Sequence, residues 1–188
     1  RHKRPHNFSL QFDVPWQSKP LVERRNRIPI TERLTPPTGV IETPMSEDEV
    51  RAAAELFKKR GLDAVIVGFL FSFLNNAHEK RAVEIIKEVM PDAFVSASSE
   101  VVNVIREYER FSSTAMNAYI GPKTALYLRS LESRLKKNDI TATVRIMQSN
   151  GGISTIDQSA SRPIGLLLSG PAGGVIGGRW TGSHCDTS

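Results

Sequence analysis

A glycine-rich stretch near the end of the chain, residues 166–178, restricts what this sequence can fold into more than any other. It opens with the apolar run Leu166–Leu168, which predicts a short buried strand. A tight turn follows, in which Ser169 can cap a helix and Pro171 can occupy its first turn without losing a bonded N–H group. The stretch therefore predicts a strand that leads directly into a helix.

The glycines of this predicted helix share one face, because they recur at helical spacing: Gly170, Gly173, Gly174, Gly177 and Gly178. Each interior glycine costs a helix roughly 1 kcal/mol relative to alanine, so the helix needs a close contact on this face. Either a second small-residue helix or a phosphate-bearing ligand at the N-terminus could supply the contact. We favour helix packing, since the stretch matches neither a Walker A loop nor a G-x-G-x-x-G fingerprint.

Composition excludes several classes of protein. The 188 residues, of which 39% are hydrophobic, suit one globular domain with a small appendage. The net charge of +5 is spread along the chain without a basic and aromatic stripe, which argues against nucleic-acid binding. No apolar run is long enough to span a membrane. A single cysteine, Cys185, fits a reducing compartment and predicts the cytoplasm.

Residues 1–45 are rich in proline, arginine and polar residues, and we interpret them as an extended arm or an edge hairpin. The two short strands of this hairpin are predicted at residues 21–30 and 39–43, joined by the turn at Pro36–Gly39. The chain begins without methionine, so we expect it to be an interior piece of a longer protein, with part of the arm and the residues after Gly177 poorly packed.

Residues 46–188 alternate helix and strand, which predicts an α/β domain with a mostly parallel sheet and flanking helices. Helices are expected at 46–61, 76–91, 101–136 with a break or kink at Gly121-Pro122, and 157–161, and strands at 64–71, 93–96, 141–148 and 166–168. Ligands of such sheets bind beyond the carboxyl ends of the strands. This rule places both the Asn150-Gly151-Gly152 turn and the Ser169-Gly170-Pro171 turn at a ligand site.

From residue chemistry alone the chain offers no complete active site and no catalytic residue. Its histidines, at positions 2, 6, 78 and 184, lack metal-ligand spacing, so no metal site is predicted. The run Arg106–Arg110 predicts a solvated helix face with local ion pairs. His78 and Glu79 are better explained by capping of the second helix than by acid–base chemistry.

Four segments together resemble the hydantoinase A/5-oxoprolinase family. They are Phe71–Glu79 (FSFLNNAHE), Arg106–Thr114 with Asn117–Tyr119 (REYERFSST and NAY), Met147–Gly152 (MQSNGG) and Leu168–Gly174 (LSGPAGG). They follow the order of that family and cover nearly the whole chain. The family includes ATP-dependent N-methylhydantoinases and 5-oxoprolinases, which open cyclic amides, and subunits of acetone and acetophenone carboxylases.

The resemblance implies a lobe of an actin-like ATPase with a ribonuclease H-like fold. ATP and Mg would bind in the parent protein through two Asp-x-Gly-Gly-Thr loops, and this chain contains neither. We therefore expect no nucleotide bound to this piece and no activity from it alone. The resemblance also implies a partner, a hydantoinase B-type subunit or domain, and it leaves homo-oligomerisation open.

The resemblance gives the glycine-rich helix a role, since a small-residue helix crosses its counterpart at the hinge between the lobes of actin-like ATPases. It implies a hinge or nucleotide-proximal position for Ser169, Gly170, Ala172, Gly173, Gly174 and Gly177, and a substrate-proximal one for Asn150, Gly151 and Gly152. The leading hypothesis is a fragment of an ATP-dependent cyclic-amide hydrolase. A ketone carboxylase subunit and a non-catalytic interaction domain are the alternatives.

Overall fold

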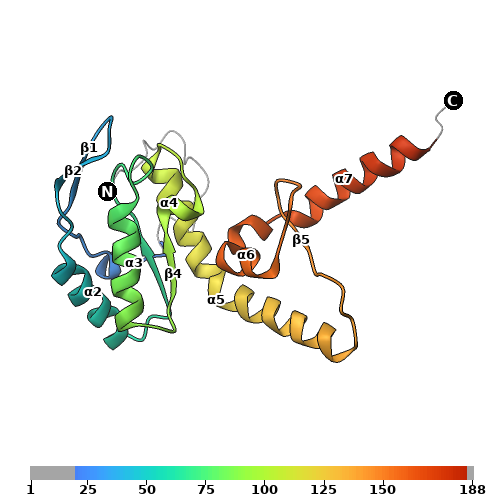
Figure 1. Ribbon diagram of the computed structural model, residues 1–188, viewed down its shortest axis with the longest axis horizontal. Coiled ribbons are helices and arrows are strands. Elements are labelled where there is room, and N and C mark those ends of the chain that lie inside the picture. The colour runs from blue at the N-terminus through green and yellow to red at the C-terminus, as the bar shows by residue number, and fades with distance from the viewer. Residues whose placement is uncertain (1–19, 186–188) are drawn as a thin grey trace, which may run out of the picture.

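The computed structural model describes residues 20–185, which form two halves joined by one long helix, α5 (Glu107–Lys137). The N-terminal half, residues 20–116, is a layered α/β unit. The C-terminal half, residues 123–185, is mainly helical with one small hairpin (Figure 1). The predicted α/β class is thus confirmed, whereas the mostly parallel sheet is wrong. Within residues 20–185 the strands form three two-stranded pairs, and one of these pairs is parallel.

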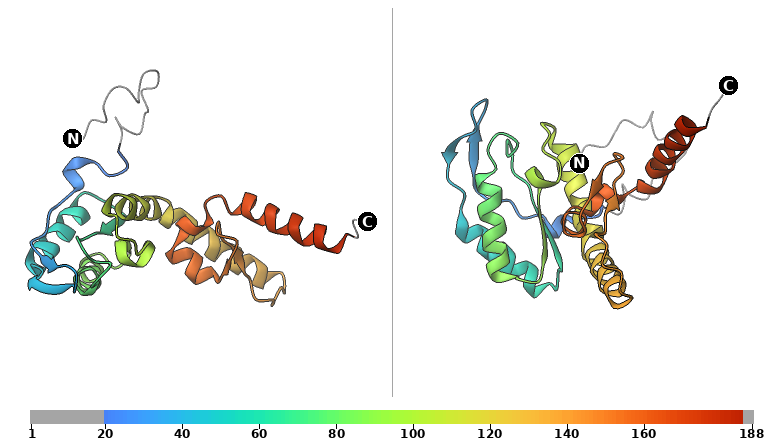
Figure 2. Two further views of the ribbon diagram at one scale, coloured as in Figure 1. Left: turned by 90° about the horizontal axis from the view of Figure 1, so that it is seen from above. Right: turned by 45° about the vertical axis from the view of Figure 1, so that its right-hand side comes forward.

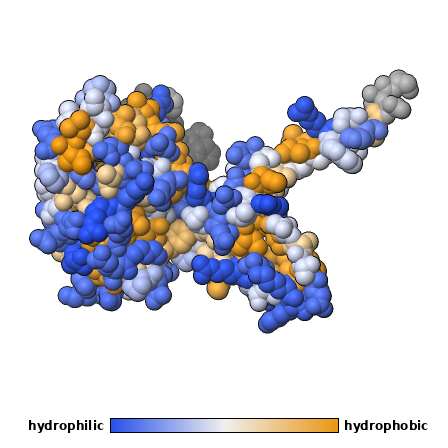
Figure 3. Space-filling view, in the orientation of Figure 1, coloured by the Kyte–Doolittle hydropathy of each residue, from blue (hydrophilic) through white to orange (hydrophobic). Residues whose placement is uncertain are grey.

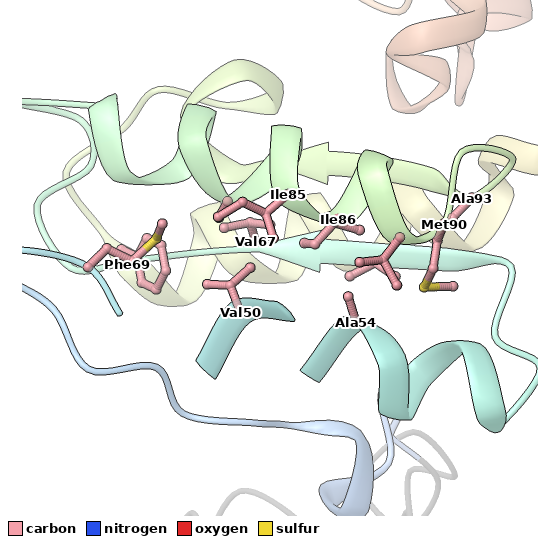
Figure 4. Close-up of a cluster of buried hydrophobic side chains, with 12 residues drawn as sticks. Val50, Ala54, Val67, Phe69, Ile85, Ile86, Met90 and Ala93 are labelled. Carbon is pink, nitrogen blue, oxygen red and sulfur yellow. The ribbon is translucent and has the colours of Figure 1, made fainter. Parts of the chain in front are cut away.

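The parallel pair is formed by β3 (Ala64–Val67) and β4 (Phe94–Ala97), which pair in register from Ala64 with Phe94 to Val67 with Ala97. The helices α2 (Glu47–Lys59) and α3 (Ala77–Val89) cover one face of this pair. The apolar stripes of the two helices pack against the strand side chains and form the hydrophobic core shown in Figure 4. The core consists of Met45, Val50, Ala54, Val65, Val67, Phe69, Ala82, Ile85, Ile86, Val89, Met90 and Ala93.

The start and the end of α2 agree with the predicted range of 46–61. The Ser46 hydroxyl accepts a hydrogen bond from the N–H of Glu49, and Gly61, with φ +66°, follows the end of the helix. The reciprocal bond that would complete a capping box is missing, because the Glu49 carboxylate binds Thr31 instead. It accepts from the Thr31 N–H at 2.6 Å and from the Thr31 hydroxyl at 3.0 Å. Glu49 therefore ties the incoming segment to α2.

The other face of the parallel pair is covered by the first part of α5, at very close range. A Cβ atom on Gly68 would lie 2.6 Å from the Phe111 ring, and one on Gly121 would overlap the Phe94 ring. Each glycine thus makes room for an aromatic ring of the other layer. The prediction for Gly121-Pro122 was a break or a kink, and the break is wrong, because the helix continues through Pro122. Packing on both sides of the proline outweighs its missing hydrogen bond.

The segment before α2 forms the predicted hairpin, with a shifted first strand. β1 (Arg33–Thr35) pairs antiparallel with β2 (Val40–Thr43) around the Pro36–Gly39 turn. Residues 21–30, predicted as the first strand, instead contain a short 3-10 helix, η2 (Arg24–Asn26). The Arg27 guanidinium closes this turn by donating to the Val22 carbonyl. The part of the predicted arm before residue 20 lies outside the described residues.

The C-terminal half departs further from the expected pattern. In place of a strand over 141–148, β5 (Ile146–Met147) pairs antiparallel with β6 (Ile153–Ser154). The short helix α6 (Ile156–Ser161) is confirmed, and Thr155 and Gln158 form its capping box. The predicted strand at 166–168 is wrong: the 3-10 helix η3 (Pro163–Leu166) occupies that region, because Pro163 and Gly165 favour a tight turn.

The glycine-rich helix α7 (Ser169–His184) follows η3 and projects away from the rest of the described chain (Figures 1 and 2). It has no buried residue. The expectation that the residues after Gly177 pack poorly is therefore confirmed for those up to Cys185. Among residues 20–185, no helix is both long enough and apolar enough to cross a membrane.

Candidate functional site

The start of α7 differs from the predicted turn in one detail. Leu168, with φ +62°, takes the position before the helix, and Ser169 is the first helical residue and makes no capping bond. Pro171 lies in the first turn, as expected. Leu168 is 79% exposed, which a residue of a buried strand could not be. The left-handed backbone at Leu168 turns the chain outward from the C-terminal half.

The two predicted site segments, the 150–152 turn and the glycine-rich helix, lie next to each other. A Cβ atom on Gly151 would be 2.7 Å from Cδ1 of Ile176, and one on Gly173 would be 3.7 Å from Cγ of Met147. They meet because the β5–β6 hairpin rests against α7, and not at the edge of a parallel sheet as predicted. Gly151 has φ +83°, a conformation that favours glycine.

Within the turn, the polar groups largely satisfy one another. The Asn150 side-chain oxygen accepts from the N–H of Gly152 at 2.9 Å, which is an Asx turn. The Ser149 N–H donates to the Gly165 carbonyl at 2.7 Å, so the turn is also fixed to η3. The predicted turn at Asn150–Gly152 is therefore confirmed, and the Asn150 side chain closes it.

The remaining glycine face of α7 is open. Cβ atoms placed on Gly170, Gly174, Gly177 and Gly178 would meet no atom within 4 Å among the described residues. Apolar side chains on the same helix are also exposed, including Val175 at 74% and Trp180 at 65%. Figure 3 shows a hydrophobic patch on α7 near its start. A helix of this composition is stable only if something packs on the bare face. No described part of the chain does so.

A second group of functional candidates, which the sequence analysis dismissed, lies at the carboxyl ends of β3 and β4. Glu79 is completely buried, and its carboxylate accepts four hydrogen bonds. The donors are the N–H of Phe69 (3.0 Å), the hydroxyl of Ser98 (2.6 Å), and the N–H and hydroxyl of Ser99 (2.8 and 2.7 Å). The capping interpretation of Glu79 is wrong, because the carboxylate joins the ends of two strands instead of its own helix.

His78, the other residue assigned to capping, is buried as well. Its Nδ1 lies 2.9 Å from a carboxylate oxygen of Glu32, the residue that precedes β1. The side chain thus connects α3 to the hairpin β1–β2, and the predicted cap is wrong, because no side-chain hydrogen bond caps the start of α3 at Asn76.

Arg110 also contradicts its prediction, since it is completely buried and not part of a solvated face. Its guanidinium donates to the carbonyl of Phe69 at 2.6 Å and to that of Val104 at 3.0 Å, and it lies 5.1 Å from the centre of the Phe111 ring. Its Nε has no hydrogen-bond partner among the described residues. Arg106, one turn earlier, is exposed as predicted.

Asn117 completes this group and connects the two halves of the molecule. Its amide nitrogen donates to the hydroxyl of Ser96 at 3.1 Å and to the carbonyl of Ser161 at 3.3 Å, and its oxygen accepts from the N–H of Ile164 at 3.1 Å. The side chain is completely buried. Glu79, Arg110 and Asn117 all belong to the segments that carry the family resemblance, which was the one sequence signal for their importance.

Residues 20–185 contain few candidate metal ligands that lie together. They hold no group of three or more His, Cys, Asp or Glu side chains that could bind a metal ion. The first turn of α7 carries no acidic residue, and its glycines face open space instead of forming a cradle.

Comparison with known proteins supports the family. The model of the hydantoinase/oxoprolinase N-terminal region matches residues 1–90, and the hydantoinase/oxoprolinase model matches residues 110–187. The chain belongs to the hydantoinase/oxoprolinase family. It is 40% identical over 176 residues to an uncharacterized protein of Methanocaldococcus jannaschii, a match that covers 94% of this chain and 25% of that protein.

Two ATP-dependent enzymes share the fold. The chain is 34% identical to the alpha subunit of caprolactamase from Pseudomonas jessenii, in a match that covers 81% of this chain and 22% of that subunit. The crystal structure of that caprolactamase superposes with a TM-score of 0.77 over 89% of this chain and 26% of that chain, at 31% identity. Nucleotide-free acetone carboxylase gives a TM-score of 0.70 over 82% of this chain and 22% of that chain, at 25% identity. The chain thus spans about a quarter of the length of these relatives.

Proposed function

We propose that this chain is part of an ATP-dependent enzyme that opens cyclic amides, and that it contributes the scaffold of the α7 hinge but not the nucleotide site. The observation that carries the proposal is the family match over almost the whole chain, together with the likeness to ATP-dependent caprolactamase. Caprolactam is a cyclic amide, as are hydantoins and 5-oxoproline, so one class of substrate unites caprolactamase with the hydantoinases and oxoprolinases that name the family.

The glycine face of α7 supports a position between lobes. Gly170, Gly174 and Gly178 are spaced four residues apart and face open space, so a second helix could approach the backbone closely. We propose that a helix of the full-length protein crosses α7 here, beside the nucleotide. The Asn150–Gly152 turn, which packs against α7, would then lie on the substrate side.

The cofactors and partners follow from the same proposal. ATP with Mg would be held by other parts of the full-length protein, since the described residues supply no ligand set for it. A hydantoinase B-type subunit or domain would complete the enzyme, as the alpha designation of the caprolactamase relative is consistent with several subunits. The chain alone would be inactive.

Calorimetric titration of MgATP into this chain and into the full-length protein tests the proposal. We expect binding to the full-length protein and none to the chain. With the partner subunit present, hydantoin, 5-oxoproline or caprolactam should stimulate release of ADP. Tight binding of MgATP to the chain would instead make residues 169–174 a phosphate cradle and would overturn the scaffold proposal.

A matched pair of variants tests the role of α7. Gly174→Leu places a side chain on the bare face, and Val175→Leu enlarges a side chain that is already exposed. Neither should destabilise this chain, because neither residue is buried. In the full-length enzyme we expect Gly174→Leu to abolish ATP-dependent turnover and Val175→Leu to retain it. Equal activity of the two variants would contradict the helix crossing.

A ketone carboxylase is the second candidate, and the similarity to acetone carboxylase is the observation that favours it. The same ADP-release assay separates the two functions. Stimulation by a ketone with bicarbonate, and none by cyclic amides, would assign the chain to the carboxylases. A full-length protein that binds no nucleotide would point to a non-catalytic interaction domain.

A further inference from the structure

The two halves of the molecule have separate hydrophobic cores. The core of the N-terminal half lies between α2, α3 and the parallel strands. In the C-terminal half, Leu128 of α5 packs with Ile156 and Ala160 of α6. The halves are joined mainly through α5, and the space-filling view shows two masses connected by a narrower region (Figure 3). Units that share little apolar interface are free to move relative to each other.

Two hydrogen-bonded links join the halves directly. Asn117 connects Ser96 of β4 to the α6–η3 segment through its three hydrogen bonds. A second link runs from the Arg162 guanidinium to the carbonyl of Val101 at 2.8 Å. Polar contacts can be replaced by water at low cost, whereas an apolar core cannot be opened in this way. The interface therefore resists rotation only weakly once these bonds open.

The helix itself is weakest at the same place. Pro122 has no N–H, so the carbonyl of Ala118 lacks its helical donor, and a proline inside a helix is a common site of bending. Gly121 lies directly before it, against Phe94, with no side chain to add stiffness. The interruption of the helical bonds thus coincides with the boundary between the two cores.

We propose that residues 117–122 of α5 form a hinge, and that the Asn117 side chain is the latch that holds it in the observed position. When the latch opens, the C-terminal half turns about Pro122 and carries the β5–β6 turn and α7 with it. The strand ends around Glu79 and Arg110 stay with the N-terminal half. The inference concerns motion within this chain and does not depend on the proposed substrate.

Pulsed electron paramagnetic resonance between spin labels measures this motion directly. The experiment uses the 188-residue chain with Cys185→Ser and labels at two exposed positions, Lys58 in α2 and Asp157 in α6, which report across the hinge. Labels at Lys58 and Glu84, both exposed within the N-terminal half, form the control pair. We expect a wider distance distribution for the pair across the hinge than for the control pair.

Three variants distinguish motion about the hinge from a general loosening of the fold, because they should change the distance distribution of one label pair only. Asn117→Ala and Arg162→Ala each remove a link and should widen the distribution across the hinge. Pro122→Ala restores an N–H donor for the carbonyl of Ala118 and should narrow it. The control pair should not change. Arg162 is exposed, so its variant keeps the test informative if Asn117→Ala fails to fold.

Hydrogen exchange supplies a second readout for the latch. The N–H of Ile164 donates to Asn117, so its exchange should become roughly tenfold faster in Asn117→Ala, as expected for the loss of one buried hydrogen bond. A distribution across the hinge as narrow as that of the control pair would overturn the proposal. The proposal would also be overturned if Pro122→Ala widened the distance distribution across the hinge, or if Arg162→Ala widened the distributions of both label pairs equally.

Discussion

Glu79 and Arg110 bind opposite ends of the same residue, Phe69. The Phe69 N–H donates to the Glu79 carboxylate at 3.0 Å, and the Phe69 carbonyl accepts from the Arg110 guanidinium at 2.6 Å. The two buried charges are therefore connected through Phe69 at the end of β3, although they lie 31 positions apart in the chain. This arrangement fixes the loop after β3 between α3 and α5.

Arg110→Met tests whether this buried guanidinium supports the fold. The variant leaves the carbonyls of Phe69 and Val104 without their donor, so the free energy of unfolding should fall by about 3 kcal/mol. Arg106→Met, on the exposed side of the same helix start, is the control and should change it by less than about 0.5 kcal/mol. Urea unfolding measures both. Similar values for the two variants would restore the solvated-face interpretation.

Glu79→Gln keeps the size of the side chain but turns one acceptor into a donor. The amide NH2 of the glutamine side chain would then face a backbone N–H, that of Phe69 or that of Ser99, so we expect Glu79→Gln to destabilise the chain by about 2 to 3 kcal/mol. Glu100→Gln, an exposed change in the neighbouring short helix α4 (Ser98–Val101), should have almost no effect. Thermal unfolding followed by circular dichroism compares them, and an equally mild Glu79→Gln would contradict a structural role for the carboxylate.

Two glycine-to-alanine changes in helices should act in opposite directions. Gly121→Ala puts a methyl group into the Phe94 ring and should destabilise the chain by roughly 1 to 3 kcal/mol. In Gly178→Ala the added methyl group has no atom within 4 Å among the described residues, and alanine has a higher helix propensity than glycine. This change should therefore stabilise α7 by up to about 1 kcal/mol. Hydrogen exchange of the α5 and α7 amides resolves the two effects. Protection lost in α7 on Gly178→Ala would indicate that a partner already covers the bare face.

Acid should remove the contribution of one exposed ion pair. The hydrogen bonds from Arg81, at 2.7 and 2.8 Å, lower the pKa of the Glu47 carboxyl from its usual value, and the same pairing raises the pKa of Arg81. A carboxyl whose pKa is lowered by folding stabilises the protein above its unfolded pKa, near 4.5, and loses this effect as the pH falls through the lower folded value.

The measurement is urea unfolding of the unchanged chain and of Arg81→Gln over a pH series. The unchanged chain should be slightly more stable than Arg81→Gln at neutral pH. This difference in the free energy of unfolding should shrink below pH 4.5 and in high salt. Lys80→Gln, the adjacent exposed position, serves as the control for loss of a positive charge. A difference that persists in acid would assign the effect of Arg81 to packing.

The sequence by itself determined the elements whose signals are local. Ser46 and Gly61 mark the ends of α2, the short helix α6 was predicted near residues 157–161, and the glycine spacing of α7 predicted a helix with a bare face. These features depend on residues a few positions apart, where backbone conformation and capping chemistry decide the outcome. The motifs also identified the family, because their order along the chain needs no structure.

Only the tertiary structure decided the roles of Glu79, Arg110 and Asn117. Their partners lie between six and 47 positions away, and a charged residue in a helix is normally exposed, so local patterns favoured capping and solvated faces. Strand pairing was misjudged for the same reason. An apolar run such as Leu166–Leu168 becomes a strand only if a neighbour offers backbone groups to pair with, and here Pro163, Gly165 and the Asn117 side chain hold that backbone in a turn.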